Sequence, residues 1–473
     1  MAELRSPEQI DGSPDQLKRV MGPGLLLLFI IGDILGTGIY ALTGTVAKEV
    51  GGAVWLPFLL AFVVAVMTAF AYLELVTKYP HAGGAAVYTN RAFKNGFFTF
   101  MVAFTVTASG ITSSATASRA FAENIMKGFG LGDQAGLVTL IAVGFIALVM
   151  AVNLWGVGES VKANIVLTVI ELSGLLLVIF VGFLAMVNGT ADFSRTLVFE
   201  TPHDKGMFLA VSAATSVAFF AMVGFEDSVN MAEETKNPSQ IFPKIMLTGL
   251  GITGVIYVLV SLTAVAIVPV GELTQTGATP LLTVVQMGAP GLPFGAIFPF
   301  ISMFAVANTA LINMLMASRL LYGMAKQGIL PPVFGAIMKS RQTPWFSIVF
   351  TSVLAAVLIT FVGQVSQLGG TTALLLLGVF TITNVAVLVL RKDTVEHDHF
   401  TAPTWIPIVA GLCTFYLVGP WTGRPLEQFQ IALVLLGIGA VLGVITYVIN
   451  KMIRHQPVEI SHVEYLGGDG PRN

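Results

Sequence analysis

The sequence contains one cysteine, Cys413, which excludes an intrachain disulfide and a thiolate metal cluster. Charged side chains are also scarce, at 11% of the chain, whereas soluble domains carry roughly 25%. The six histidines include no H-E-x-x-H pattern, and no G-x-x-x-x-G-K-[ST] phosphate loop is present. A zinc peptidase and an ATP-driven pump are therefore not expected, and neither is any cofactor.

Apolar residues dominate the composition: they make up 55% of the chain, and the mean hydropathy is +0.83. Twelve apolar segments predict an all-α polytopic membrane protein with twelve transmembrane helices, because a helix of ~20 apolar residues crosses a ~30 Å hydrocarbon core. The segments lie at 24–46, 54–77, 97–126, 135–154, 161–187, 207–231, 242–268, 294–324, 346–364, 372–390, 403–420 and 429–449. The polar start of the chain has no signal-peptide pattern, so we expect the first segment to be retained as a span.

The distribution of Lys and Arg predicts the orientation of these spans. With the N-terminus placed in the cytoplasm, the cytoplasmic segments hold 18 of the 24 basic residues and the other side holds 6. Positive charge is enriched in cytoplasmic loops. We therefore expect a multi-pass protein of the plasma (inner) membrane with both termini in the cytoplasm.

The first apolar segment contains a stretch that a continuous helix does not favour. Gly32, Gly36 and Gly38 lie within seven residues, and each glycine costs a helix ~1 kcal/mol relative to Ala. Asp33 lies among them at membrane depth, where a charge costs at least ~2.5–3.5 kcal/mol. A helix that breaks here explains both features, since unwound backbone is tolerated at this depth beside protein or a water-filled cavity. The alternative is a glycine-lined packing face.

The sixth segment has a similar middle, in which Gly224 is followed by Glu226 and Asp227. Interrupted helices at corresponding places in two halves are typical of inverted-repeat transporters, whose binding site lies at the midplane. We expect cytoplasmic tails at 1–20 and 451–473, a first repeat at 21–190, an inverted second repeat at 191–392, and two further helices at 393–450.

Four ordered blocks resemble the amino acid–polyamine–organocation (APC) transporters, and the cationic amino acid transporter branch is the nearest. The blocks are ILGTGIY at 34–40, AYLEL at 71–75 with YPHAGGAAVY at 79–88, residues 219–226 with EETKNP at 233–238, and SRLLYGMAKQG at 318–328. The resemblance implies a LeuT-like fold of five-plus-five inverted repeats with discontinuous helices 1 and 6. It also implies uptake of amino acids or related amines.

A broken helix suits the two charges of an α-amino acid. Free N–H groups at the start of a half-helix bind an anion, and free carbonyls at the end of a half-helix bind a cation. We expect the amides around Thr37 and Gly38 to receive the carboxylate, with Gly36 keeping the approach open. The carbonyls expected to receive the ammonium, at positions that match the family's substrate contacts, belong to Ile34, Phe220, Ala221 and Val223. Alternatively, Thr37 bonds back to its own helix and Phe220 is ordinary core.

Three acids are candidates for coupling or gating. Glu226 matches a family position that is linked to proton control, or it lies at a water-accessible opening of the protein. Asp33 holds the substrate amine, a proton or a cation, or it caps the broken backbone. Glu171 stands where some sodium-independent relatives have a lysine, so that role does not carry over. It binds a proton, helps to hold a cation near the carbonyls of Gly32 and Leu35, or pairs with another polar residue.

The sequence therefore predicts a secondary active amino-acid transporter that is proton-coupled or exchanging. Its expected partners are a small amino acid substrate, membrane lipid and a proton, with sodium less favoured and no nucleic acid. The alternatives are an amino acid or polyamine exchanger and a non-transporting sensor on the same fold. The acids near the site favour a cationic substrate, unless protons neutralise them. An enzyme is not expected, since no nucleophile–histidine pairing is present.

Overall fold

The computed structural model describes residues 22–80, 84–132, 134–202, 205–232, 235–326, 329–338 and 340–449, with the backbone alone at 157–162 and 449. The predicted tails at 1–20 and 451–473 lie outside the described residues, as do the motif residues at 81–83, 233–234 and 327–328.

The described chain is almost entirely helical. Its α-helices are α1 Pro23–Ile34, α2 Thr37–Val50, α3 Trp55–Lys78, α4 Gly84–Phe93, α5 Gly96–Gly128, α6 Ala135–Trp155, α7 Val157–Val187, α8 Met207–Ala218, α9 Pro238–Ile267, α10 Val270–Leu273, α11 Pro280–Gly288, α12 Phe294–Lys326, α13 Trp345–Val362, α14 Val365–Leu390, α15 Trp405–Val418 and α16 Leu426–Ile449. Short 3₁₀ turns are η2 Phe193–Leu197, η3 Phe219–Met222, η4 Asp227–Met231, η5 Pro332–Gly335 and η6 Pro420–Thr422.

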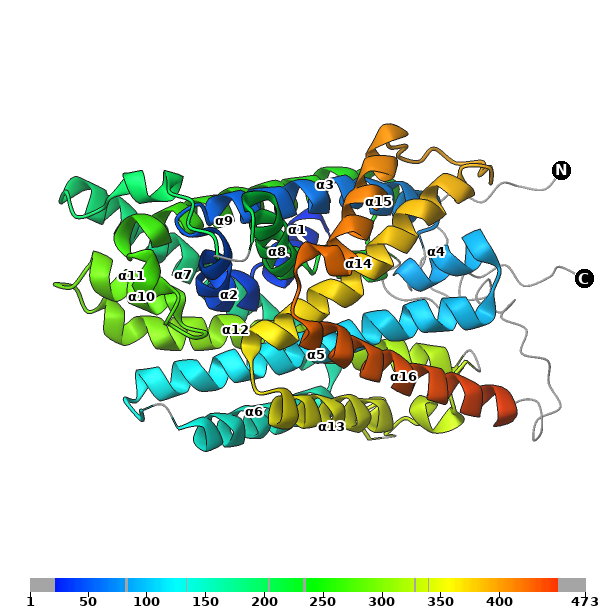
Figure 1. The fold of residues 1–473 in the computed structure, drawn as a ribbon. Coiled ribbons are helices and arrows are strands. Elements are labelled where there is room, and N and C mark those ends of the chain that lie inside the picture. The colour runs from blue at the N-terminus through cyan, green and yellow to red at the C-terminus, as the bar shows by residue number, and fades with distance from the viewer. Residues whose placement is uncertain are drawn as a thin grey trace, which may run out of the picture.

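The long helices run side by side across the molecule, with α4 at one end and α10 and α11 at the other (Figure 1). Within the described residues, eleven helical stretches are long and apolar enough to cross a membrane, and α1 with α2, like α8 with η3 and η4, counts as one stretch. The predicted segment 403–420 corresponds to α15, an apolar helix of only 14 residues. The polytopic helical prediction is confirmed, whereas the count of twelve spans stays a prediction.

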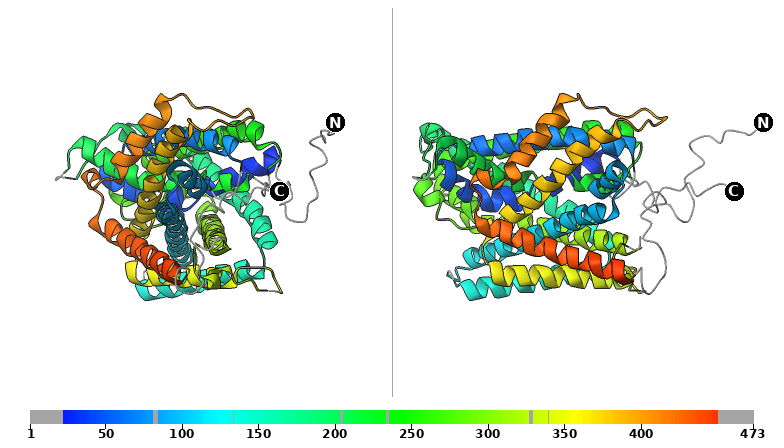
Figure 2. Two further views of the ribbon diagram at one scale, coloured as in Figure 1. Left: turned by 90° about the vertical axis from the view of Figure 1, so that its right-hand side faces the viewer. Right: turned by 45° about the vertical axis from the view of Figure 1, so that its right-hand side comes forward.

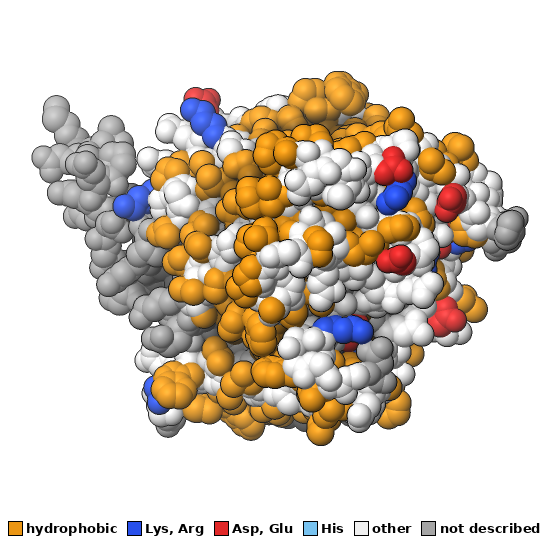
Figure 3. Space-filling model, turned by 90° about the vertical axis from the view of Figure 1, so that its left-hand side faces the viewer, with side chains coloured by type: hydrophobic (Ala, Val, Ile, Leu, Met, Phe, Trp, Pro, Cys, Tyr) orange, Lys and Arg blue, Asp and Glu red, His pale blue; other side chains and the backbone are white. Residues whose placement is uncertain are grey.

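The outer surface carries many large apolar side chains. Phe361 is 83% exposed, and Leu140 and Leu433 are each 68% exposed. Apolar side chains cover much of the face seen from the α10–α11 end, and the acidic and basic side chains there are scattered (Figure 3). Leu140 in α6 and Leu433 in α16 lie along long helices, where exposed apolar side chains suit contact with lipid.

Two large buried apolar clusters form most of the interior of the described chain. One joins residues of α1, α2, α3, α8, α9 and α14, and the other joins residues of α5, α6, α12, α13 and α16. The most extensive helix pair is α5 with α12, and the left view of Figure 2 shows these two helices nearly end-on and adjacent. The pair therefore forms a wall against which the helices of the first cluster pack.

Both predicted interruptions are present. Helix α1 ends at Ile34, the backbone is extended at Leu35 and Gly36, and α2 begins at Thr37. Helix α8 tightens into η3, after which Val223 is extended and Gly224 has φ +125°. A side chain rarely tolerates that φ value, which explains why a glycine stands there.

Candidate binding site between two broken helices

The two breaks lie against each other. A Cβ atom added to Gly38 would lie 2.3 Å from the Cα atom of Ala221, and one added to Gly224 would lie 2.5 Å from the carbonyl oxygen of Asp33. Both distances are far below van der Waals contact. The glycines predicted to mark the breaks thus also let the two unwound backbones touch.

A small hollow opens beside this contact. Its lining is made of predicted site residues and of polar residues from α5 and α12: Asp33, Ile34, Gly36, Thr37, Gly38, Ser113, Phe220, Val223, Thr309 and Asn313. The predicted residue Ala221 is absent from the lining because its Cα faces Gly38. Glu171, Glu226, Gly32 and Leu35 also lie outside this lining.

Two backbone groups at the first break already have partners. The Tyr257 hydroxyl donates to the carbonyl oxygen of Ile34 at 2.7 Å, and the backbone N–H of Thr37 donates to Thr309 Oγ1 at 3.2 Å. The Thr37 hydroxyl is buried without a hydrogen-bond partner, so it does not bond back into its own helix. An incoming carboxylate would have to share or displace the Thr309 hydroxyl at Thr37.

The Asp33 carboxyl group is buried without a hydrogen-bond donor or a cationic partner among the described residues. Asp33 is 6% exposed, and neither of its carboxylate oxygens has a hydrogen-bond partner. The ionisable groups that act on it electrostatically are Asp227, Glu226 and Glu171, which are all acids. In the part of the chain that the structure describes, none of these four carboxyl groups forms a salt bridge. The site therefore has an excess of potential negative charge.

Glu171 and Asn308 form a polar cluster behind the first break. The Asn308 side-chain nitrogen lies 3.2 Å from the carbonyl oxygen of Gly32, 3.3 Å from Thr168 Oγ1 and 3.4 Å from Glu171 Oε2. Glu171 Oε1 and Asn308 Oδ1 are buried without partners. In the region predicted to hold a cation, the Asn308 amide therefore donates to the Gly32 carbonyl oxygen that a cation would coordinate.

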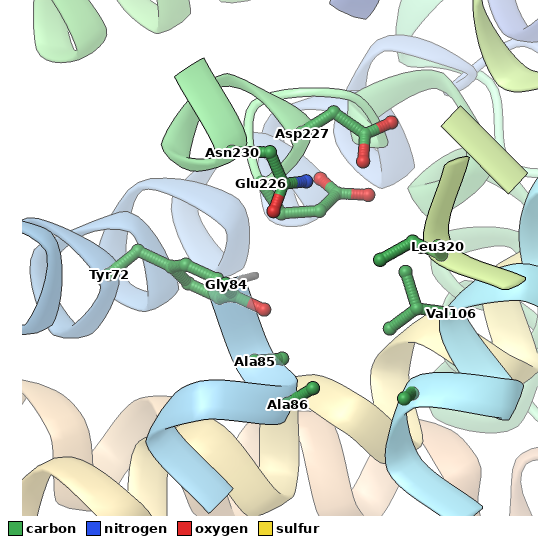
Figure 4. A pocket seen from close by; sticks show the side chains of 10 residues that line it. Tyr72, Gly84, Ala85, Ala86, Val106, Glu226, Asp227, Asn230 and Leu320 are labelled. Carbon is green, nitrogen blue, oxygen red and sulfur yellow. The ribbon is translucent and has the colours of Figure 1, made fainter. Parts of the chain in front are cut away.

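Glu226 bonds to the second break. Its Oε2 atom accepts the backbone N–H of Gly224 at 2.9 Å, so the carboxylate caps backbone that the break leaves free. Glu226 and Asp227 also line two further hollows on the α4 side of the break (Figure 4).

Asn308, Thr309, Asn313 and Tyr257 were absent from the predicted site. A signal for three of them is present in the sequence, since Asn308, Thr309 and Asn313 are polar residues in the middle of the apolar segment 294–324. Polar residues inside a membrane span face the protein interior and are often functional. Tyr257 gives no such signal, because an aromatic residue in a span is ordinary core.

A separate polar cluster closes the α4 end. Glu74 receives two hydrogen bonds from the Arg391 guanidinium, at 2.8 and 2.7 Å, and one from the backbone N–H of Ala402 at 2.9 Å. The Glu74 carboxylate raises the pKa of Arg391 above its usual value. Lys78 donates to the carbonyl oxygens of Leu390 and Asp393. These bonds fasten the segment after α14 to the last turns of α3.

Comparison with known proteins decides the family. A family model described as amino acid permease matches residues 25–446. The chain belongs to the amino acid permease family. This permease is 30% identical over 430 residues to the methylthioribose transporter of Bacillus subtilis (strain 168), which covers 85% of this chain and 88% of that protein.

Two other relatives are similar over comparable lengths. The permease is 24% identical over 421 residues to the branched-chain amino acid permease BcaP of the same bacterium, across 85% of this chain and 87% of BcaP. It is 29% identical over 394 residues to the vacuolar cationic amino acid transporter 4 of Arabidopsis thaliana, across 80% of this chain and 64% of that protein. The predicted APC resemblance is confirmed, and the permease is a multi-pass membrane transporter, not an enzyme.

Proposed function

We propose that this permease is a secondary active transporter that takes up amino acids across the plasma membrane by proton-coupled alternating access. The observation that carries the proposal is the contact between the two broken helices, beside a hollow that residues of both breaks line. The beginning of α2 offers N–H groups around Thr37 and Gly38 for a carboxylate. The carbonyls of Ile34, Phe220, Ala221 and Val223 are the proposed partners of the ammonium.

The unpaired acids support proton coupling. An ionised carboxylate buried without a partner is so costly that it neutralises or recruits a cation instead. Asp33 and Glu171 are both buried with unpartnered oxygen atoms. We propose that Asp33, Glu171 and Glu226 take up and release protons or the cationic group of the substrate as the two breaks move. The bonds from Asn308 around Gly32 make a sodium ion there the less favoured alternative.

We further propose that residues 21–190 and 191–392 form a LeuT-like inverted repeat. In support, the first repeat begins with the broken pair α1–α2, and the second begins with the broken stretch α8–η3. Moving one repeat relative to the other would open the hollow to one side of the membrane at a time. Both termini are proposed to be cytoplasmic, on the distribution of Lys and Arg.

Flux into proteoliposomes tests the proposal. The purified permease would be reconstituted and supplied with labelled proteinogenic amino acids, putrescine and methylthioribose, in sodium-free buffer with an acidic exterior. We expect concentrative uptake of at least one α-amino acid, abolished by a protonophore. Gly38→Ala should abolish uptake, because its Cβ would meet Ala221. Gly144→Ala is the matched control, since nothing lies within 4 Å of a Cβ at that position.

The same assay separates the alternatives. Uptake that occurs only when substrate is preloaded inside would identify an exchanger. Binding without flux in either direction would identify a sensor. Uptake that requires sodium and ignores the pH gradient would contradict proton coupling while leaving amino-acid transport intact.

A further inference from the structure

The hollow on the α4 side of the second break is a separate space with its own lining. Its walls come from α3, α4, α5, α12 and the segment around η4, and the lining residues are Tyr72, Gly84, Ala85, Ala86, Ala103, Val106, Glu226, Asp227, Asn230 and Leu320. None of the residues that carry the proposed substrate contacts at the breaks belongs to this lining.

One wall of the hollow is acidic. Asp227 is 8% exposed, and its carboxylate forms neither a hydrogen bond nor an ion pair with the residues that the structure describes. Figure 4 shows the side chains of Glu226 and Asp227 extending from one segment toward the side on which Leu320 and Val106 lie. Glu226 has one oxygen bonded to Gly224. A carboxylate in a nine-tenths buried side chain that has no protein donor is available to a cationic group that enters the hollow.

The opposite wall is the beginning of a helix. Helix α4 starts at Gly84, and Gly84, Ala85 and Ala86 line the hollow. The first N–H groups of a helix have no acceptor within that helix and carry partial positive charge, so they attract anions. A Cβ added to Gly84 would lie 3.2 Å from Asn230 Oδ1, which shows how closely α4 approaches the segment of η4.

A further hollow lies between this one and the site at the breaks. Its lining includes Glu226, Asp227, Val106 and Leu320, which also line the hollow at α4, and Asn313, which also lines the hollow beside the breaks. The two carboxylates therefore stand on the side of the breaks from which a molecule would move toward α4.

We propose that this hollow is a second binding position for the same α-amino acid, occupied between the broken helices and the α4 end. The Asp227 and Glu226 carboxylates hold the ammonium group, and the N–H groups at the start of α4 hold the carboxylate. The proposal rests on the proposed function, since it concerns the route of that substrate. A simpler role for the acids, stabilising the N-terminus of α4 by charge alone, is an outcome of the test.

The test places a cysteine in the hollow. Ala86→Cys would be made in a Cys413→Ser background and labelled with a cationic and an anionic methanethiosulfonate reagent, with Leu320→Cys as a second reporter. Two carboxylates beside the reporter should favour the cationic reagent about tenfold, and Asp227→Asn should reduce that preference. L-Leucine or L-lysine should slow labelling, by about tenfold at ten times its dissociation constant. Analogues with an acetylated amino group or an amidated carboxyl group each lack one charge and should not slow labelling.

Three variants decide the result. Asp227→Asn should remove protection by the amino acid, and Asp227→Glu should restore it. Asp192→Asn is the matched control, since that acid is solvent-exposed and pairs with Arg195. The second position would be overturned if the amino acid did not slow labelling of the parent, or if it slowed labelling of Asp227→Asn to the same extent. If Asp227→Asn also melted at a lower temperature than the parent in the latter case, the acids would be assigned to stabilising the N-terminus of α4. Uptake by the parent is measured separately. If the amino acid slowed labelling but was not taken up, the result would count against the proposed function alone.

Discussion

The side-chain nitrogen of Asn308 in α12 lies 3.2 Å from the carbonyl oxygen of Gly32, in the last turn of α1. The same nitrogen reaches Glu171 in α7. Three helices therefore meet at one amide, just before the backbone unwinds. Because the last carbonyl groups of a helix have no N–H donor within that helix, an outside donor stabilises such an end.

Replacing Asn308 tests the importance of this amide. Asn308→Ala should leave the Gly32 carbonyl and the Glu171 carboxyl without their donor, at a cost of about 1–3 kcal/mol in stability. Asn308→Asp should cost more, since it would place a second carboxyl beside Glu171. Melting of the detergent-solubilised protein measures both effects. Thr360→Val, at an exposed residue bonded only to its own helix, is the control and should melt like the parent.

The close packing of α1 on α7 predicts that a second substitution can restore a variant impaired by the first. A Cβ added to Gly32 would lie 1.9 Å from Thr168 Oγ1, so Gly32→Ala should lower the melting temperature and reduce uptake severely. Thr168→Gly removes the atoms that clash and should restore part of both in the double variant. A double variant as impaired as the single one would show that Thr168 is not the obstacle. Gly144→Ala should be neutral or slightly stabilising, by up to ~1 kcal/mol.

The ion pair at the α4 end should contribute to stability over the usual pH range. Glu74 is almost fully buried, and removing one partner of a buried pair costs about 3–5 kcal/mol. Arg391→Gln should therefore destabilise the protein. Because the hydrogen bonds with Glu74 raise the pKa of Arg391 above its usual value in the folded state, the contribution of the pair is fully present below the usual value and is lost only as the pH rises through the folded one. The melting difference should thus be equal at about pH 6 and about pH 9.

Asp33 gives a test of charge at the first break. Asp33→Asn keeps the shape and removes the ionisable group, so the initial rate of uptake should fall at least about tenfold if a proton or cation binds there. The pH dependence of uptake should also change. Parental uptake with a parental pH profile in this variant would contradict an ionic role and leave Asp33 as a local structural residue.

Glu226 gives a separate test at the second break. An amide oxygen can still accept the backbone N–H of Gly224, so Glu226→Gln should preserve the fold. Proton-driven accumulation should fall, while exchange between labelled and unlabelled substrate across the membrane continues. Measuring uptake from pH 5 to pH 8, about the range in which perturbed carboxyl groups titrate, provides the readout. A pH profile that matches the parent would remove Glu226 from the coupling mechanism.

Part of the site was predictable because the residues concerned are anomalous in a membrane span. Gly36, Gly38 and Gly224 disfavour helix, and Asp33 and Glu226 disfavour lipid, so both breaks could be located within a few residues. Asn308 and Thr309 carry the same kind of signal more weakly, since a single amide or hydroxyl is often satisfied within its own helix. Tyr257 and the start of α4 had no local signal that linked them to a site.

The sequence by itself determined the membrane class, the places where two helices unwind and the family, because each depends on local composition or on short ordered motifs. Only the tertiary structure decided that Gly38 lies against Ala221, that Asn308 joins α1 to α7, and that Asp227 and the beginning of α4 line one hollow. These contacts join residues that are far apart along the chain. The packing of whole helices, rather than any local preference of the residues themselves, brings such partners together.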